Sequence, residues 1–331
     1  MQKRLHKHDG ADCRGREKSA AIALKSGSRL LVETSWLFNQ FEASLVKNSM
    51  ELLGLGATAK KRIMGNMTDD TWLKYENNGL AHKMMKNRIP VLEEMYLQFC
   101  GLAGVLGWDR TITNSMADTI MPFMDIGERT CYTYYGHNYR SMQYAEMLLD
   151  YRGVGAAEKA EIMLGTLLHD TGKAGVPGGI LRKEGRPNLV EGKYIEKHTV
   201  YGRDILTGAA RLHAPPRSLI RAQMGRIADI ALSHQEKFCG KGYPRQKAGA
   251  DICIGARIAA FCDALDAMTS KRLYQKGMPK TFAQARGIAL IEMNVHFNEN
   301  IVTDFFKAVD KVHGLKDRIY AIISGCGGNP E

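Results

Sequence analysis

The sequence predicts an all-α protein, a helical bundle preceded by a smaller helical domain at the N-terminus. Apolar residues recur at helical spacing along the 331-residue chain, and convincing alternating patterns typical of strands are scarce. The composition, 44% hydrophobic and 24% charged, is that of a globular protein and excludes a disordered or fibrous chain. A chain of this length is expected to form about two domains, each able to bury a core.

Residues 1–28 are basic and polar, and we expect a flexible arm with no folded element. This stretch lacks the apolar segment and small-residue cleavage site of a secretory signal. An electrostatic contact with a partner or with nucleic acid is the alternative role for the arm. Over the whole chain, lysine and arginine exceed aspartate and glutamate by 11. Such an excess favours nucleic acid, nucleotides or an anionic membrane surface as partners, although surplus surface lysines would give the same number.

Residues 29–126 are expected to form the smaller helical domain, with regulation or dimerisation as its role. Apolar residues at helical spacing predict one helix over 29–55 and a second over 88–106, with Pro90 in the first turn of the second. The glycine-containing segment 125–127 predicts the boundary to the larger domain, because the chain becomes rich in histidine and aspartate after it. The larger domain is placed at 127–320 and a tail at 321–331.

The seven cysteines predict a reduced, cytoplasmic protein. Their number is odd and no pair has Cys-x-x-Cys spacing, which argues against a disulfide framework or a thiolate zinc site. No segment approaches the roughly 18 consecutive apolar residues that a membrane span needs, so none is expected.

Histidine and aspartate recur on separate predicted helices of the second half. A helix from Ala156 runs to His169 and Asp170, where glycines end it, so that both side chains can turn towards one point. His198 is expected on a short helix over 194–206. His234 extends a buried helical stripe that starts at Ile220, and an imidazole there needs a partner; the ordinary alternative is a satisfied core histidine.

Two aspartates follow small residues in the helical pattern of the segment 252–276. Asp263 and Asp266 continue a stripe begun by Ala256 and Ala259, beside the apolar stripe of the same helix. A carboxylate in an apolar helix must be paired or ligated, whereas an exposed helix edge is the alternative, above all for Asp266. Helices of a bundle can point such groups into one core site. Nitrogen and carboxylate donors without thiolates suit Fe or Mn, with Mg or Zn as alternatives.

Five motifs follow one another in a fixed order through this half of the chain. They are His-Asp-Thr-Gly-Lys at 169–173, the isolated His198, H-Q-E-x-x-x-G-x-G-Y-P at 234–244, D-A-L-D-A-M-T-S at 263–270 and H-F-N-E-N-I-V at 296–302. The segment Gly-His-Asn-Tyr-Arg around His137 precedes them. This order resembles that of HD-GYP domains, metal-dependent phosphohydrolases of the HD superfamily. The resemblance covers residues 137–305, and residues 1–125 resemble no sensory or receiver domain.

The resemblance implies an all-helical HD-type bundle with a binuclear metal centre in its core. Two divalent ions, Fe or Mn with Mg, Zn or Ni as alternatives, would activate a water. The resulting hydroxide would cleave cyclic di-GMP, or cyclic GMP-AMP, to a linear dinucleotide. Carried over by position, the metal ligands would be His137, His169, Asp170, His198, His234, Gln235 and Asp263. Asp170 and Lys173 would be catalytic, and the substrate would be bound by Lys173, Tyr243, Asp266, Arg272 and Lys276.

The chain departs from the family pattern at several positions. Gln235 stands in place of the second of two histidines, and Cys239 in place of an aspartate. Thr133 replaces a glutamate that binds a third metal in some members, and Gln275 replaces a second arginine, for which Lys276 is a partial substitute. Two alternatives therefore stand beside the phosphodiesterase: a degenerate domain that binds a nucleotide or a signalling protein without turnover, and a general HD-type nucleotide phosphohydrolase.

The resemblance also implies partners in bacterial second-messenger signalling. We expect a cyclic dinucleotide as ligand, a diguanylate cyclase or other signalling protein at the loop around Gly242, Tyr243 and Pro244, and a homodimer. Long nucleic acid is not expected. The glycine-rich stretch 172–192 is expected to form a mobile flap over the site, with an ordinary exposed connection as the alternative.

Overall fold

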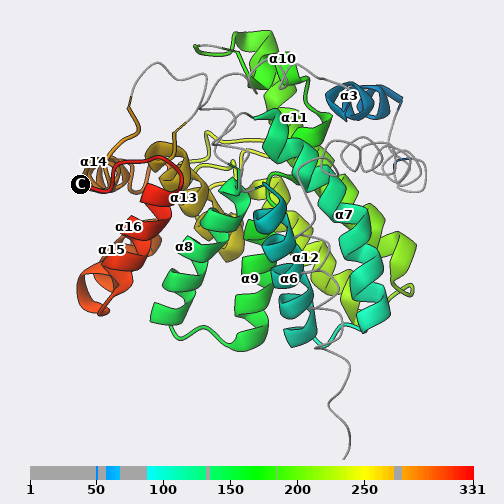
Figure 1. Ribbon diagram of the computed structural model, residues 1–331, viewed down its shortest axis with the longest axis horizontal. Helices are drawn as coiled ribbons and strands as arrows, with labels where there is room; N and C mark the ends of the chain where they lie inside the picture. Colours follow the sequence, from blue (N-terminus) through cyan, green and yellow to red (C-terminus); the bar gives the residue numbers. More distant parts are fainter. Residues whose placement is uncertain (1–49, 51–56, 68–87, 132–134, 184, 272–277) are drawn as a thin grey trace, which may run out of the picture. The chain divides into compact units, whose positions relative to one another are not determined.

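The computed structural model describes residues 50, 57–67, 88–131, 135–183, 185–271 and 278–331 (Figure 1). These residues belong to one compact unit, residues 46–331. The predicted arm, and the predicted helix over 29–55 except for residue 50, lie outside the described residues. Within the described ranges every regular element is a helix, apart from one isolated bridge between Met293 and Phe297. The predicted all-α class is confirmed.

The helices follow one another along the described part of the chain, and the long connection over 234–248 separates α12 from η3. None of these helices is both long enough and apolar enough to cross a membrane. The elements are α3 (Ala57–Met67), α6 (Arg88–Val105), α7 (Arg110–Thr130), α8 (His137–Tyr151), α9 (Ala156–Leu167), the 3-10 turn η2 (Thr171–Gly175), α10 (Gly178–Leu181), α11 (Leu189–His213), α12 (Leu219–Ser233), the 3-10 turn η3 (Gly249–Asp251), α13 (Ile254–Thr269), α14 (Phe282–Ile291), α15 (Glu299–Lys311) and α16 (Leu315–Gly325).

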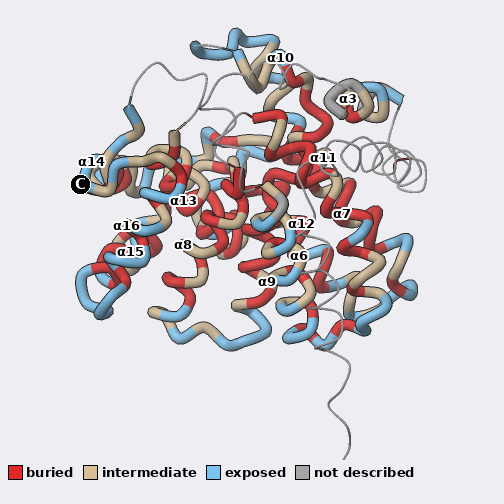
Figure 2. The backbone as a smooth tube through the Cα atoms, in the orientation of Figure 1, coloured by how far each residue is buried: buried red, intermediate tan, exposed pale blue. Residues whose placement is uncertain are grey.

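Helix α9 is the centre of the packing, because α6, α8, α12 and α13 all lie against it (Figure 1). Its apolar residues are buried and join one hydrophobic cluster with those of its neighbours, as the buried segments in Figure 2 show. Leu164, Leu167, Ile227 and Phe261 are among the most deeply buried members of this cluster. Helix α9 ends inside the bundle, so the residues that follow it are delivered to the core.

Helix α11 is longer than the sequence predicts. The expected short helix over 194–206 was wrong, since α11 spans Leu189–His213. Asn188 and Glu191 form a capping box that starts it five residues earlier than expected. Pro215 and Pro216, which cannot continue a helix, follow its end. Helix α11 packs along both η2 and α12.

The segment expected as a domain boundary is continuous helix. Asp125 lies on the buried side of α7, where its carboxylate accepts hydrogen bonds from Arg88 at 2.8 and 2.6 Å and from the Tyr135 hydroxyl at 2.7 Å. Arg129 lies 2.9 Å from the same group. Helix α6 also packs on α9, and α7 packs on η2 and α11. A two-domain organisation stays a prediction, and residues 125–127 connect elements that pack together.

Gly172 permits a close approach between η2 and α11. A Cβ at Gly172 would lie 1.9 Å from the His198 carbonyl oxygen and 2.3 Å from the Gly202 nitrogen, both backbone atoms of α11. A Cβ at Gly202, on the other side of the contact, would meet nothing nearer than 3.5 Å. We expect Gly172→Ala to destabilise the fold by about 3 kcal/mol, because the backbone of α11 cannot move aside.

The matched control for this prediction is Gly202→Ala. It adds the same methyl group to the same contact and replaces a helical glycine, so we expect a change within about 1 kcal/mol. The midpoints of urea unfolding compare the two variants with the parent. Equal losses in both would contradict the backbone clash at Gly172.

Candidate metal centre

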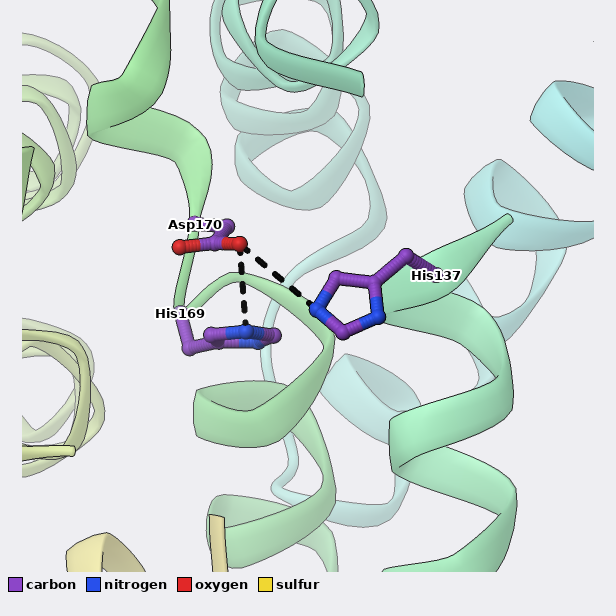
Figure 3. A group of neighbouring side chains, drawn as sticks. All are labelled: His137, His169 and Asp170. Atoms are coloured by element: carbon purple, nitrogen blue, oxygen red, sulfur yellow. Dashed lines mark ion pairs between the residues drawn. The ribbon is translucent and has the colours of Figure 1, made fainter. Parts of the chain in front are cut away.

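Four side chains meet where α8, α9 and α13 converge, and we call this place position A. His137 is the first residue of α8, and His169 and Asp170 follow the end of α9. The Asp170 Oδ2 atom lies 3.4 Å from His169 Nε2 and 3.7 Å from His137 Nε2 (Figure 3). Asp263, from α13, places Oδ1 3.1 Å from His137 Nε2 and 3.9 Å from His169 Nε2. Position A therefore gathers two imidazoles and two carboxylate oxygens.

The second oxygen of Asp170 faces another pair of histidines, and we call this place position B. Asp170 Oδ1 lies 3.5 Å from Nε2 of His198 on α11 and 3.7 Å from Nε2 of His234 at the end of α12. The two Nε2 atoms are 3.2 Å apart. One carboxylate thus faces both positions, with one oxygen towards each.

Three of these imidazoles are oriented by the backbone of their own segment. His169, His198 and His234 each place Nδ1 against the carbonyl oxygen three residues earlier. A carbonyl only accepts, so Nδ1 carries the proton and Nε2 presents a lone pair to the centre. The distances are 2.7 Å from His169 to Thr166, 2.5 Å from His198 to Ile195 and 2.8 Å from His234 to Ala231.

This donor set fits metal ions. The Nε2 atoms of His198 and His234 face each other 3.2 Å apart with no proton to share, an arrangement that a cation stabilises. His169 Nε2 and Asp170 Oδ1 are buried with no hydrogen-bond partner among the described residues. Buried polar atoms without partners are costly, and ligation is one way to satisfy them. Three groups of neighbouring His and Asp donors overlap in this centre: His137, His169 and Asp170; His169, His234 and Asp263; and Asp170, His198 and His234.

Burial sets the protonation of the centre. It lowers the pKa of His234 to about 3, with His169 and His198 adding to the effect, and it also lowers the pKa of His198. Both imidazoles are therefore neutral at pH 7, as metal ligands must be. Burial alone would raise the pKa of the Asp170 carboxyl, but Lys173 and His169 hold it well below its usual value. The bridging carboxylate stays ionised.

Asp266 contacts the ring nitrogen of His137 that does not face position A. Its Oδ2 atom lies 2.6 Å from His137 Nδ1, and Arg140 donates to its two oxygens at 2.7 and 3.1 Å. Burial lowers the pKa of His137, but Asp263 and Asp266 outweigh it and raise that pKa to about 9. Asp266 is fully buried with both oxygens engaged. This placement rules out the exposed helix edge considered for Asp266, and it makes Asp266 a residue that orients His137; a contact of Asp266 with substrate stays a prediction.

We expect Asp266→Asn to weaken metal binding at position A by about 10- to 100-fold, because an amide cannot hold the imidazole as firmly. Titration of the metal-free protein with Mn²⁺ measures this, with circular dichroism reporting the fold. Arg140→Lys keeps a cation beside Asp266 and should lose less affinity. An unchanged first binding constant in Asp266→Asn would count against the orienting role.

Glu128 is a functional residue that sequence reasoning missed. Its carboxylate accepts hydrogen bonds from the backbone nitrogens of Gly136, His137 and Asn138 at 3.0, 3.2 and 2.8 Å. It thereby caps α8, whose N-cap position is a glycine without a side chain. A glutamate eight residues upstream of the N-cap position gives no local capping signal. The missing cap at Gly136 was the only cue that a distant acceptor was needed.

A cavity of about 220 Å³ lies beside position A. Lys173 lines it and pairs with Asp170 Oδ2. The expected flap over 172–192 contains η2 and α10 and supplies part of the wall, although its mobility stays a prediction. The cavity residues that carry charge are Glu128, His137, Asp170, Lys173 and Lys183; Ile180, Leu181, Pro187 and Ile195 form its aliphatic side.

The Gly-Tyr-Pro loop folds back on the end of α12. A Cβ at Gly242 would lie 2.2 Å from the Lys237 nitrogen and 2.4 Å from Glu236 Cα, so only glycine fits there. The buried Glu236 carboxylate accepts from two backbone nitrogens of the loop, at 2.7 and 3.1 Å. The ring centroids of Tyr243 and His198 are 6.3 Å apart, and burial raises the pKa of Tyr243. Tyr243 therefore lies beside position B.

Of the remaining predicted residues, some are described by the structure and the others lie outside the described residues. The Gln235 side chain donates from Nε2 to Asp263 Oδ2 at 2.9 Å. Arg272 and Lys276, expected at the substrate, lie outside the described residues, as do Thr133 and Gln275. Cys239 is exposed on the loop.

Part of the chain is similar in sequence to known proteins. A family model described as an HD domain matches residues 123–297. The chain is 34% identical over 167 residues to 3'3'-cGAMP-specific phosphodiesterase 2 of Vibrio cholerae, covering 50% of this chain and 30% of that protein. It is 35% identical over 149 residues to a cyclic di-GMP phosphodiesterase of Pseudomonas aeruginosa, covering 45% and 33%. A cyclic di-GMP phosphodiesterase of Thermotoga maritima is 37% identical over 127 residues, covering 38% and 32%. The chain spans about a third of the length of these relatives.

Proposed function

The chain belongs to the HD domain family, and on that premise we propose that it is a metal-dependent phosphodiesterase acting on a cyclic dinucleotide, cyclic di-GMP or cyclic GMP-AMP. The product is a linear dinucleotide. One observation carries the proposal: the Asp170 carboxylate lies between two groups of imidazoles and presents one oxygen to each. The similarity to phosphodiesterases of both substrates supports it.

The chain's own donors would hold two divalent ions, with Fe or Mn as the metal. His137, His169, Asp170 and Asp263 form position A, and Asp170, His198 and His234 form position B. Ions held there supply a Lewis acid for the phosphate and lower the pKa of a water towards neutrality. The buried imidazoles fix the ligand geometry, and the cavity beside position A gives the phosphodiester a place to bind.

Lys173 is assigned to the phosphate. It lines the cavity next to position A, and its ammonium can donate to non-bridging phosphate oxygens. Burial lowers the pKa of Lys173, but Asp170 outweighs it and raises that pKa above its usual value. The side chain is therefore a fixed positive charge and a poor proton donor to the leaving group. Tyr243, Arg272 and Lys276 complete the proposed substrate contacts.

The proposal also includes the location of the protein in the cell and its protein partners. A cytoplasmic location follows from the reduced thiols; Cys100, Cys131, Cys239, Cys253, Cys262 and Cys326 are free. A signalling protein is proposed at the loop that carries Tyr243, and a homodimer as the assembly. Binding without turnover is the second candidate function, and the specific observation in its favour is the amide of Gln235 in place of an imidazole.

A measurement of turnover distinguishes the phosphodiesterase from a domain that binds the nucleotide without hydrolysing it. The full chain, loaded with Mn²⁺ or Fe²⁺ under reducing conditions, is incubated with cyclic di-GMP and with 3'3'-cyclic GMP-AMP, and linear products are followed by chromatography. We expect a linear dinucleotide from at least one substrate and none from Asp170→Ala. Absence of product from both substrates would overturn the enzyme proposal and leave the binding module.

A further inference from the structure

The amide of Gln235 contacts a metal-ligating carboxylate. Gln235 directly follows His234, yet its Nε2 atom lies 2.9 Å from Asp263 Oδ2. A carboxylate only accepts, so the amide presents its N–H group to Asp263. The other oxygen of Asp263 faces His137 Nε2 at 3.1 Å. Asp263 is thus held between a ligand of position A and the Gln235 amide.

We propose that Gln235 is a positioning residue for Asp263, and that the centre therefore binds its two ions unequally, position A more tightly than position B. This inference rests on the metal centre of the proposed function. It concerns the order in which the ions bind, and it goes beyond the reaction itself.

The donor sets of the two positions differ in number and charge. Position A gathers the imidazoles of His137 and His169 with one oxygen each from Asp170 and Asp263. At position B the nearest carboxylate oxygen to the imidazoles of His198 and His234 is the second oxygen of Asp170, whereas Asp263 comes near His234 only within the wider group that it forms with His169 and His234. A second carboxylate adds negative charge to position A, and hard divalent ions favour carboxylate oxygens.

The orientation of the ligands adds to the difference in metal affinity between positions A and B. Partners behind the ligands typically change metal affinity by about 10- to 100-fold. Position A has two such side chains, Asp266 behind His137 and Gln235 on Asp263. For Gln235 to ligate an ion at position B, its amide would have to leave Asp263. Position B would then gain only a neutral oxygen ligand. Asp263 at position A would lose the hydrogen bond that the Gln235 amide donates.

Titration of the metal-free full chain with Mn²⁺, read as the electron paramagnetic resonance signal of free Mn²⁺, tests this without substrate. In the parent we expect a first equivalent that binds at least about 10-fold more tightly than the second. Gln235→Leu removes the N–H donor and should weaken the first equivalent by about 10-fold, with the second unchanged. Gln235→His supplies an imidazole and should strengthen the second equivalent by about 10-fold. Gln98→His, on α6, is the matched control and should change neither.

Three outcomes would overturn the inference: two equal equivalents in the parent, no bound Mn²⁺, or a loss confined to the second equivalent in Gln235→Leu. The last would show that Gln235 is itself a ligand of position B. Circular dichroism of each variant confirms that the fold is kept. Turnover is measured separately, so a chain that binds two ions unequally and hydrolyses nothing would sustain this inference and sink the phosphodiesterase.

Discussion

Replacing Asp170 with alanine is expected to remove metal from both positions and to reduce turnover of the cyclic dinucleotide by about a thousandfold or more. Asp170 faces both groups of imidazoles, with its oxygens 3.4 to 3.7 Å from their Nε2 atoms. A loss of about 4 kcal/mol in transition-state stabilisation corresponds to that factor, and metal catalysis supplies several kcal/mol. Bound metal per chain, measured by elemental analysis, and initial rates of linear product give the result.

Two control variants test whether Asp170→Ala loses metal because both positions share this ligand, and not because the fold is disturbed. Asp170→Asn keeps the side-chain volume but loses the charge that Lys173 pairs with, so it should also lose both ions. His198→Ala touches position B alone and should retain one ion at position A. Two tightly bound ions in Asp170→Ala would contradict the bridging role.

Replacing Asp125 with asparagine is expected to destabilise the fold by about 3 to 5 kcal/mol at pH 7. Asp125 is fully buried and pairs with Arg88 and Arg129, and the Tyr135 hydroxyl donates to it. An amide at this position would remove the negative charge that faces the partly buried guanidinium groups of Arg88 and Arg129. Urea unfolding of the parent and the variant measures the loss.

The pH dependence of this loss has a definite sign. Burial alone would raise the pKa of Asp125, but Arg129 and Arg88 hold it well below its usual value. A carboxylate with a lowered pKa contributes stability that is complete above its unfolded pKa of about 3.9 and is lost as the pH falls through the folded value. The difference between parent and Asp125→Asn should therefore be constant from about pH 5 to 8 and shrink below about pH 4.

Asp118→Asn is the matched control for Asp125. Asp118 lies on the same helix, α7, with an exposed side chain near the Tyr96 hydroxyl. We expect it to change stability by no more than about 0.5 kcal/mol. Equal losses at the two positions would mean that the buried ion pair is not what stabilises α7.

Much of the fold and of the centre could be predicted from the sequence, because both depend on spacing along helices. The helix over 88–106 matches α6, and the helices that carry His169, His234 and Asp263 match α9, α12 and α13. The motif order selected metal-ligand candidates on or next to five helices, and the structure brings His137, His169, Asp170, His198, His234 and Asp263 together. The length of α11 could have been predicted, since Asn188, Glu191 and Pro215 are ordinary start and stop signals.

Other features depend on contacts that no spacing reveals. Gly127 suggested a boundary, but its missing Cβ allows α7 to approach η2, where the Asp170 carbonyl oxygen would lie 3.2 Å from that atom. A glycine can thus mark close packing inside a helix as readily as a break. Helical spacing placed Asp266 beside Asp263 but could not say that Arg140 and His137 enclose it. The direction of the Gln235 amide is likewise a property of the folded core.

The way the imidazoles are oriented limits how this centre can change during evolution. Three of them rest against main-chain carbonyls, at Thr166, Ile195 and Ala231, which any residue supplies. A substitution at any of these three positions keeps the carbonyl oxygen that the ring contacts, provided that the new side chain fits where Thr166 and Ala231 are buried. His137 alone depends on a side chain, that of Asp266. Divergence among such sequences is therefore free to tune one imidazole while the other three stay constant, and inherited adjustment of metal affinity is concentrated at the first residue of α8.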